Sequence, residues 1–223
     1  MKLSDSTLTL LKNFSTINNS ILFKPGNVIK TISQEKNIIG EAEVPETFTN
    51  EFGIFDLHDF LSVMSLFKDP TLNFEDNRIL IKEKNKATTY RKTDSDFIKD
   101  PFKIQLNLPD ILYSFELSWD HVQMILKASS VRELPDLTIQ CEDGNLSLLL
   151  FNKETKLDKF IVNLNQKVDT KNSSFTFKCE DLKLLKGVYQ VELYALNSSD
   201  AVGKFKRNNE DDMNLSYYII VQD

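Results

Sequence analysis

The residues that could support catalysis or bind a metal are few and far apart in this sequence of 223 residues. Its two histidines, His58 and His121, fall on the polar sides of expected helices, and its two cysteines, Cys141 and Cys179, are 38 positions apart. These positions match neither the spacing of a metal site nor the pattern of an activated nucleophile. We therefore interpret the histidines as surface side chains, and the cysteines as buried thiols rather than as a disulfide.

Acidic and glycine-containing segments give no better candidates. Asp94 with Asp96, and the acidic run 210–212, could bind a divalent cation, but neither has the alternating ligands and turn glycine of a calcium loop. The pair of Gly203 and Lys204 lacks the rest of a phosphate-binding loop, and no Gly-x-Ser-x-Gly motif occurs. Solvated acidic loops explain these residues better. We predict a non-enzymatic protein without a metal or a cofactor.

Four segments have the periodicity of apolar residues that predicts amphipathic helices. Three of them follow a suitable N-cap, and the fourth begins with acidic residues and ends at a glycine. The third helix is expected to bury Trp119, Val122, Ile125 and Leu126. The predicted helices are 5–17 after Ser4, 57–67 after Asp56, one that follows Ser118, and 181–186 before Gly187.

The segments between these helices predict antiparallel β-strands, with about three or four after each helix. The helix starts at 4, 56, 118 and 180 are separated by 52, 62 and 62 residues. This regularity indicates an α+β fold, either as a fourfold repeat of helix plus strands or as two domains of two repeats each. Residues 93–110 are rich in Asp and Pro and read as an extended connector, so the domains are expected at 1–110 and 111–223. The predicted strands are 21–23, 28–33, 38–44, 52–55, 71–74, 78–81, 87–91, 137–141, 146–151, 157–164, 174–177, 188–195, 201–205 and 215–221.

The composition indicates a soluble globular protein, with 41% hydrophobic and 27% charged residues. No signal peptide and no apolar run of about 18 residues is present, so we expect a cytosolic protein. The net charge of −6 argues mildly against a protein that contacts nucleic acid over its whole surface. It leaves open a protein whose basic residues gather on one face.

Lysine and hydroxyl side chains, with few carboxylates, follow the polar faces of the expected helices. Lys12 lies opposite the apolar stripe of the first helix, Lys127 on the polar face of the third, and Lys183 on that of the fourth. Such sparse lysines either keep the helices soluble or attract phosphate in a weak, salt-sensitive and sequence-independent way. The second interpretation suits a protein that slides along nucleic acid.

Several segments resemble, in the same order, the sliding clamps of T-even-type bacteriophages, which are DNA polymerase processivity factors. The N-terminal stretch that begins Met1-Lys2-Leu3-Ser4 and continues at Leu10-Leu11-Lys12 is the most specific of them. The other similar stretches are Asp56-Leu57, Phe60-Leu61, Phe151-Asn152-Lys153, Gly187-Val188-Tyr189, Tyr194-Ala195, Lys204-Phe205 and 217–221.

This resemblance implies the DNA-clamp fold, with two similar domains that each pack two helices on antiparallel sheet. It further implies a closed homotrimeric ring around double-stranded DNA in the host cytoplasm, with helices lining the hole. The implied partners are a clamp loader ATPase, the replicative DNA polymerase and late transcription factors of the sigma or coactivator type.

The resemblance also implies three groups of functional residues. A DNA-facing group would screen phosphate charge, a pocket beneath the connector would bind partner peptides, and edge strands of the two domains would join neighbouring subunits. The DNA-facing group is Lys2, Lys12, Lys68, Lys127, Arg132, Lys183 and Lys186; the pocket is Leu106, Leu108, Leu112, Tyr218 and Val221; and the subunit interface is Thr89, Tyr90, Phe160 and Val162.

A β-rich structural protein of a phage virion or tail, without a role on DNA, is the alternative. It too would be acidic, rich in phenylalanine and free of catalytic residues. The regular placement of four amphipathic helices argues against it.

Overall fold

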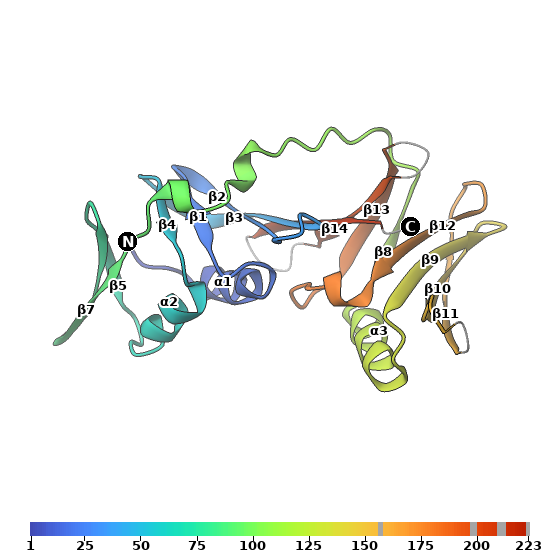
Figure 1. Ribbon diagram of the computed structural model, residues 1–223, viewed down its shortest axis with the longest axis horizontal. Coiled ribbons are helices and arrows are strands. Elements are labelled where there is room, and N and C mark those ends of the chain that lie inside the picture. The colour runs from blue at the N-terminus through green and yellow to red at the C-terminus, as the bar shows by residue number, and fades with distance from the viewer. Residues whose placement is uncertain (156–157, 197–199, 209–212, 222–223) are drawn as a thin grey trace. The chain divides into compact units, whose positions relative to one another are not determined.

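The computed structural model describes residues 1–155, 158–196, 200–208 and 213–221 (Figure 1). The chain divides into two compact units. Unit 1 consists of Met1–Gln105 with Asn209–Leu215, and unit 2 of Leu106–Asn208 with Ser216–Asp223.

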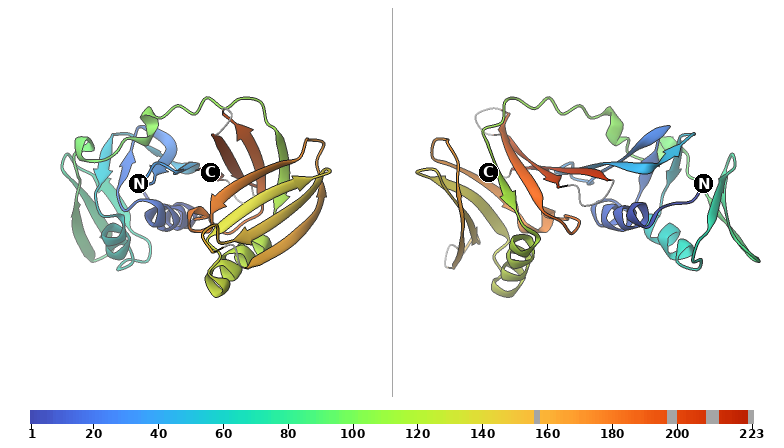
Figure 2. Two further views of the ribbon diagram at one scale, coloured as in Figure 1. Left: turned by 45° about the vertical axis from the view of Figure 1, so that its right-hand side comes forward. Right: turned by 180° about the vertical axis from the view of Figure 1, so that it is seen from behind.

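Unit 1 begins with the first predicted helix, α1 (Asp5–Ile17), whose bounds agree with the prediction. The Ser4 hydroxyl accepts a hydrogen bond from the Thr7 backbone N–H at 3.2 Å, which satisfies an N–H group that lacks a partner in the first turn. The second helix, α2 (Leu57–Met64), starts after Asp56 in the same way. It ends at Met64, so the prediction that it continues to Phe67 is wrong. The two helices lie side by side (Figures 1 and 2).

The strands of unit 1 are antiparallel and enclose an aromatic core. Phe23, Phe48, Phe52 and Phe74 stack with ring centroids 4.7–6.4 Å apart, which orients the short strands around one another. One three-stranded sheet has the order β5-β6-β7, so β7 is an edge strand. The strands are β1 (Ile21–Phe23) paired with β4 (Phe52–Ile54), β2 (Gly26–Ile32) paired with β3 (Ile38–Phe48), and β5 (Thr71–Phe74), β6 (Arg78–Glu83) and β7 (Lys86–Arg91).

The first half of the expected connector is attached to unit 1 rather than free. It forms two short 3₁₀ helices, η1 (Ser95–Phe97) and η2 (Pro101–Lys103), and buries Ile98 between them. The Asp100 carboxylate pairs with the Lys24 ammonium at 2.8 Å. The prediction of a wholly extended connector is therefore wrong for this half.

The described residues of unit 2 form two four-stranded antiparallel arrangements and one long helix. The first has the order β11-β10-β9-β12, and the second β15-β14-β13-β8. The hairpin between β9 and β10 turns at Asp143 and Gly144, which both have positive φ, as the turn residues predicted. The elements are β8 (Tyr113–Leu117), α3 (Trp119–Arg132), β9 (Asp136–Glu142), β10 (Asn145–Phe151), β11 (Lys159–Lys167), β12 (Ser173–Lys178), η3 (Cys179–Asp181), β13 (Tyr189–Ala195), β14 (Ala201–Arg207) and β15 (Asn214–Ile220).

Helix α3 buries Val122 and Ile125, as its periodicity predicted. Leu126 was expected to face inward, but it is 36% exposed, so that prediction is wrong. Strand β8 was not predicted, and residue 157, the expected start of β11, lies outside the described residues.

The fourth predicted helix is absent from residues 181–186. A single 3₁₀ turn ends at Asp181, and the chain then continues without a helix to Gly187. The Leu185 N–H donates to the Tyr217 hydroxyl at 3.2 Å, and the Tyr189 hydroxyl donates to the Leu185 carbonyl oxygen. The two hydroxyls thus satisfy both backbone groups of Leu185 without a helix, which favours a non-helical conformation at this point of the segment.

Candidate nucleic-acid and subunit interfaces

The polar face of α1 forms one exposed stripe. Thr9, Lys12 and Thr16 are exposed at helical spacing, opposite the buried Leu10, Leu11, Phe14 and Ile17. The hydroxyls of Thr9 and Thr16 donate to carbonyl oxygens of their own helix. The stripe therefore presents a single positive charge among groups whose hydrogen bonds are already satisfied.

Lys2 and Lys68 lie close to one another in unit 1, because Lys2 forms an ion pair with Asp69. The backbone N–H groups of Lys68 and Asp69 both donate to the Glu83 carboxylate. These hydrogen bonds keep the Glu83 carboxyl ionised and lower its pKa. The charge of Lys2 is thus partly balanced, while the Lys68 side chain is exposed.

The structure brings Lys127 and Arg132 together with Phe160, which the sequence assigned to another group. They line one open groove between α3 and the start of β11, with a volume of about 810 Å³. Arg132 also pairs with Asp158 at 3.2 Å, across the end of the groove. The groove is mainly apolar, with Met124, Ala128 and Val131 on its helical wall, so it differs from a surface that only contacts phosphate.

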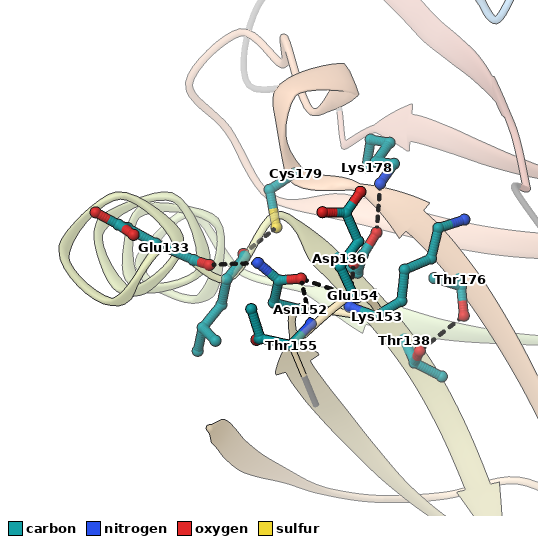
Figure 3. Close-up of polar contacts among 11 residues, drawn as sticks. Glu133, Asp136, Thr138, Asn152, Lys153, Glu154, Thr155, Thr176, Lys178 and Cys179 are labelled. Atoms are coloured by element: carbon teal, nitrogen blue, oxygen red, sulfur yellow. Dashed lines mark hydrogen bonds and ion pairs between the residues drawn. The ribbon is translucent and has the colours of Figure 1, made fainter. Parts of the chain in front are cut away.

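A buried polar network lies at the C-terminal end of α3 (Figure 3). The Asp136 side chain is only 1% exposed; its carboxylate accepts from the Lys178 ammonium at 2.6 Å and from the Lys153 N–H at 2.9 Å. The Asn152 amide oxygen accepts from the N–H groups of Glu154 and Thr155, and its nitrogen donates to the Glu133 carbonyl oxygen. The network thereby ties the loop before β11 to the end of α3.

Lys183 and Lys186 are in the non-helical segment before Gly187, not on a helix. Lys186 is exposed and Lys183 is half-buried. The Arg207 guanidinium donates to the Lys186 carbonyl oxygen at 3.0 Å, and a Cβ atom on Gly187 would collide with Arg207. The segment is therefore held at several points, although no helix supports it.

The residues expected at the subunit interface lie on two edge strands. Thr89 is exposed on β7, while the Tyr90 hydroxyl donates to the Asp56 carbonyl oxygen at 2.9 Å. Burial raises the pKa of Tyr90 to about 12, so this tyrosine stays neutral. On β11, Phe160 and Val162 are half-buried, and Ile161 between them is 60% exposed. Ile161 was not among the residues selected from the sequence, and a nonpolar side chain on an edge strand would have been the signal.

The residues expected in the peptide pocket belong to unit 2 but to two separate segments, one before β8 and one at the end of β15. The Leu112 N–H donates to Leu193 of β13, whereas the Val221 N–H donates to Ala201 of β14. Leu112 and Tyr218 are thus separated by β13 and β14. Leu106 and Leu112 are exposed and Leu108 is half-buried.

Two of the residues with catalytic potential, Asp94 and His121, take part in local structural contacts. The Asp94 carboxylate accepts from the Asp96 N–H at 3.1 Å and caps η1, and Ser118 contacts His121 at the start of α3. Both cysteines are buried free thiols, as predicted.

Two further expectations bear on the described part of the chain. Those residues contain no group of three or more His, Cys, Asp or Glu side chains arranged to hold a metal ion. The acidic run 210–212 is outside them. Among the helices described, none is long and apolar enough to cross a membrane.

Comparison with known proteins agrees with the resemblance seen in the sequence. A family model described as DNA polymerase processivity factor matches residues 2–98. The sliding clamp of Vibrio phage KVP40 is 27% identical over 231 residues, covering 100% of this chain and 99% of that protein. The sliding clamp of Escherichia phage RB69 is 26% identical and covers 100% and 97%, and that of Enterobacteria phage T4 is 27% identical and covers 90% of each chain.

The chain is similar to phage sliding clamps along nearly its whole length. The resemblance is thereby confirmed, and the names of the matched family model and of these proteins agree with the prediction of a processivity factor rather than an enzyme.

Solved clamp structures confirm the predicted DNA-clamp fold. A PCNA2–PCNA3 complex from Sulfolobus tokodaii matches with a TM-score of 0.72 at 14% identity and covers 100% of this chain and 99% of the other. PCNA from Thermococcus kodakaraensis matches with a TM-score of 0.70 at 10% identity, covering 100% and 99%. At these identities the likeness concerns the fold.

Proposed function

We propose that this protein forms a ring that encircles duplex DNA and tethers a replicative DNA polymerase for processive synthesis. The observation that carries the proposal is the similarity to three phage sliding clamps along nearly the whole chain, together with the clamp fold. We further propose a homotrimer of subunits with domains 1–110 and 111–223, loading by a clamp loader ATPase, and a role in late transcription. The alternative of a virion structural protein has no comparable support.

The proposed contact with DNA is electrostatic and sequence-independent. Lys12 of α1 and Lys127 of α3 are exposed on helical faces, and Lys186 is exposed on the segment held by Arg207. Isolated lysines attract phosphate without reading bases, and each contact is weak and screened by salt. Because each contact is weak and independent of the base sequence, DNA can move past these lysines, as a sliding ring requires.

The proposed contact between subunits joins β7 of one copy to β11 of the next. Both are edge strands with unpaired backbone groups, and edge strands of this kind readily pair with another chain. The exposed Ile161 and the apolar groove beside it supply nonpolar surface at the same place. Removing that surface from water would stabilise the assembly.

The proposed site for a polymerase peptide includes Leu106, Leu108 and Leu112, with Tyr218 and Val221. The first two leucines stand at alternate positions in the second half of the connector, and Leu112 follows shortly after them. An extended peptide with nonpolar side chains could cover them.

Solution mass and retention on DNA test the function together. A trimer of the 25.7 kDa chain would have a mass of about 77 kDa, three times the chain mass, in light scattering. Loaded rings should remain on closed circular DNA and leave it after a single cut. A strictly monomeric protein at high concentration, or equal loss from circular and linear DNA, would contradict the ring.

A pair of variants locates the subunit contact. Ile161→Asp places a charge on the proposed interface and should convert the trimer to monomers. Phe97→Asp is the control, because Phe97 is 77% exposed in η1 and lies on neither edge strand. Equal masses for the two variants would contradict the assignment of β11.

A further inference from the structure

Strand β11 is longer than the strand with which we propose it pairs. It has nine residues, whereas β7 has six. A six-residue strand could pair at full length in several registers along a nine-residue edge. Since a shift by one residue would move every paired side chain to the opposite face, a functional ring requires a single register.

A β-bulge interrupts β11 near its C-terminal end. Its residues pair regularly with β10 from Lys159 to Asn163, but the next partners, Asn145 and Lys167, follow after a register shift. Asn165 lies in this bulge and has a left-handed backbone with φ of 54°. Asparagine adopts this conformation more readily than most residues, and β-branched residues disfavour it strongly.

The bulge leaves a shorter free edge. The regularly paired run from Lys159 to Asn163 is shorter than the six residues of β7. A polar hollow of about 420 Å³ marks the place where the pairing ends, and Ser147, Asn163 and Asn165 contribute to its lining. A bulge at the end of an edge strand bends the backbone away and ends its pairing.

Gln166, the residue after Asn165 in the same irregular segment, closes a second edge. Its Nε2 atom donates to the Glu116 carbonyl oxygen at 2.7 Å, and its Oε1 atom accepts from the Glu116 N–H at 3.0 Å. Glu116 is in β8, which is an edge strand. The carboxamide therefore satisfies the two backbone groups that a further strand would bind.

We propose that Asn165 and Gln166 form a register stop for subunit pairing: the bulge at Asn165 ends the free edge of β11, and Gln166 closes the edge of β8. This inference rests on the proposed assembly through β7 and β11. Because the regular run Lys159–Asn163 is shorter than β7, the bulge stops β7 from shifting toward the C-terminal end of β11. Asn165 and Gln166 are thus specificity-determining residues that need not touch the partner.

The test measures the register by disulfide crosslinking. Thr89→Cys on β7 is combined, one at a time, with cysteines at the exposed Lys159, Ile161 and Asn163 of β11, while the native cysteines are buried. In the parent background one of the three positions should give most of the crosslinked product. The double variant Asn165→Val/Gln166→Leu should raise crosslinking at the other two positions roughly fivefold. The increase is modest because each additional cross-strand pair contributes only a small free energy.

Asn165→Gly is the matched control, since glycine retains the left-handed conformation, and it should keep the parent pattern. Faster hydrogen exchange of the Glu116 amide in Gln166→Leu, with an unchanged circular dichroism spectrum, would show that the edge opens while the unit stays folded. An unchanged crosslinking pattern in the double variant would overturn the register stop alone. A parent chain that stays monomeric and forms no crosslink would overturn the assembly, and the stop with it.

Discussion

Replacing Asp136 by alanine should be among the most destabilising single changes in unit 2. The carboxylate is almost completely buried and holds both the Lys178 ammonium and the Lys153 N–H (Figure 3). Alanine would leave an ammonium and a backbone donor without this partner. Removing one member of a buried ion pair costs roughly 3–5 kcal/mol, and losing an ordinary hydrogen bond about 0.5–1.5 kcal/mol.

The exposure of Lys178 reduces this cost. Its side chain is 23% exposed, so the ammonium can regain part of its hydration when Asp136 is removed. We therefore expect a decrease of about 3 kcal/mol in the free energy of unfolding, at the lower end of the range for buried pairs. Urea unfolding followed by circular dichroism, at one fixed protein concentration, measures it.

A second ion pair in the same unit serves as the control. Arg132 and Asp158 are 3.2 Å apart, but both side chains are more than half exposed. Asp158→Ala should cost below about 1 kcal/mol, because water screens the pair and hydrates the arginine once the carboxylate is removed. A cycle of Asp136→Ala, Lys178→Met and the double variant should give a coupling of roughly 1–3 kcal/mol. A decrease for Asp136→Ala no larger than that for Asp158→Ala would refute the reasoning.

Three further variants test other parts of the structure. Lys127→Ala should weaken the salt dependence of binding to duplex DNA. The negative slope of log affinity against log salt should shrink in magnitude by about 0.9 for each phosphate that the protein no longer neutralises. Tyr217→Phe removes the hydroxyl that accepts from a loop amide, and should speed hydrogen exchange there by an amount equivalent to about 1 kcal/mol. Burial raises the pKa of Glu192, but hydrogen bonds from Tyr194 and Lys204 outweigh burial, so its net pKa is lowered. The ionised carboxylate stabilises the fold above the pKa of about 4.3 that Glu192 has in the unfolded chain, and this stabilisation is lost as the pH falls through the lower pKa of the folded chain. Glu192→Gln should therefore make the free energy of urea unfolding less dependent on acid pH.

Each of these variants has an outcome that would contradict it. Lys171→Ala is the control for Lys127→Ala, because Lys171 is exposed but lies on no helix. If both variants reduced the salt dependence of DNA binding equally, the result would argue against a DNA-facing α3. Tyr113→Phe removes the hydroxyl of another buried tyrosine, on β8, and should leave exchange at Leu185 unchanged. A Glu192→Gln variant as acid-sensitive as the parent would show that the carboxyl contributes nothing to the pH dependence.

The sequence predicted the parts of the fold that depend on neighbouring residues. Ser4, Asp56 and Ser118 satisfy N–H groups only three residues away, and the apolar stripes that follow are equally local. The starts of α1, α2 and α3 could therefore be predicted. The hairpin turn at Asp143 and Gly144 could be predicted for the same reason.

Local rules failed for the segment 181–186. Its residues and the glycine after it are compatible with a short helix. The N–H and the carbonyl oxygen of Leu185 instead bind the hydroxyls of Tyr217 and Tyr189. Tyr217 is 32 residues away from Leu185 in the sequence. A helix of six residues gains little from its own hydrogen bonds, so such distant partners decide its conformation.

The sequence by itself determined the absence of catalytic motifs, the alternation of helices with strands and the resemblance to phage clamps. Only the tertiary structure decided which side chains meet: Lys127 and Arg132 with Phe160 in one groove, Asp136 with Lys178 beneath the loop before β11, and Gln166 with Glu116 at the edge of β8. These pairings join residues that are 28 to 50 positions apart in the chain. They depend on strand register and on the path of the loops, and neither the type nor the periodicity of the residues encodes such distances.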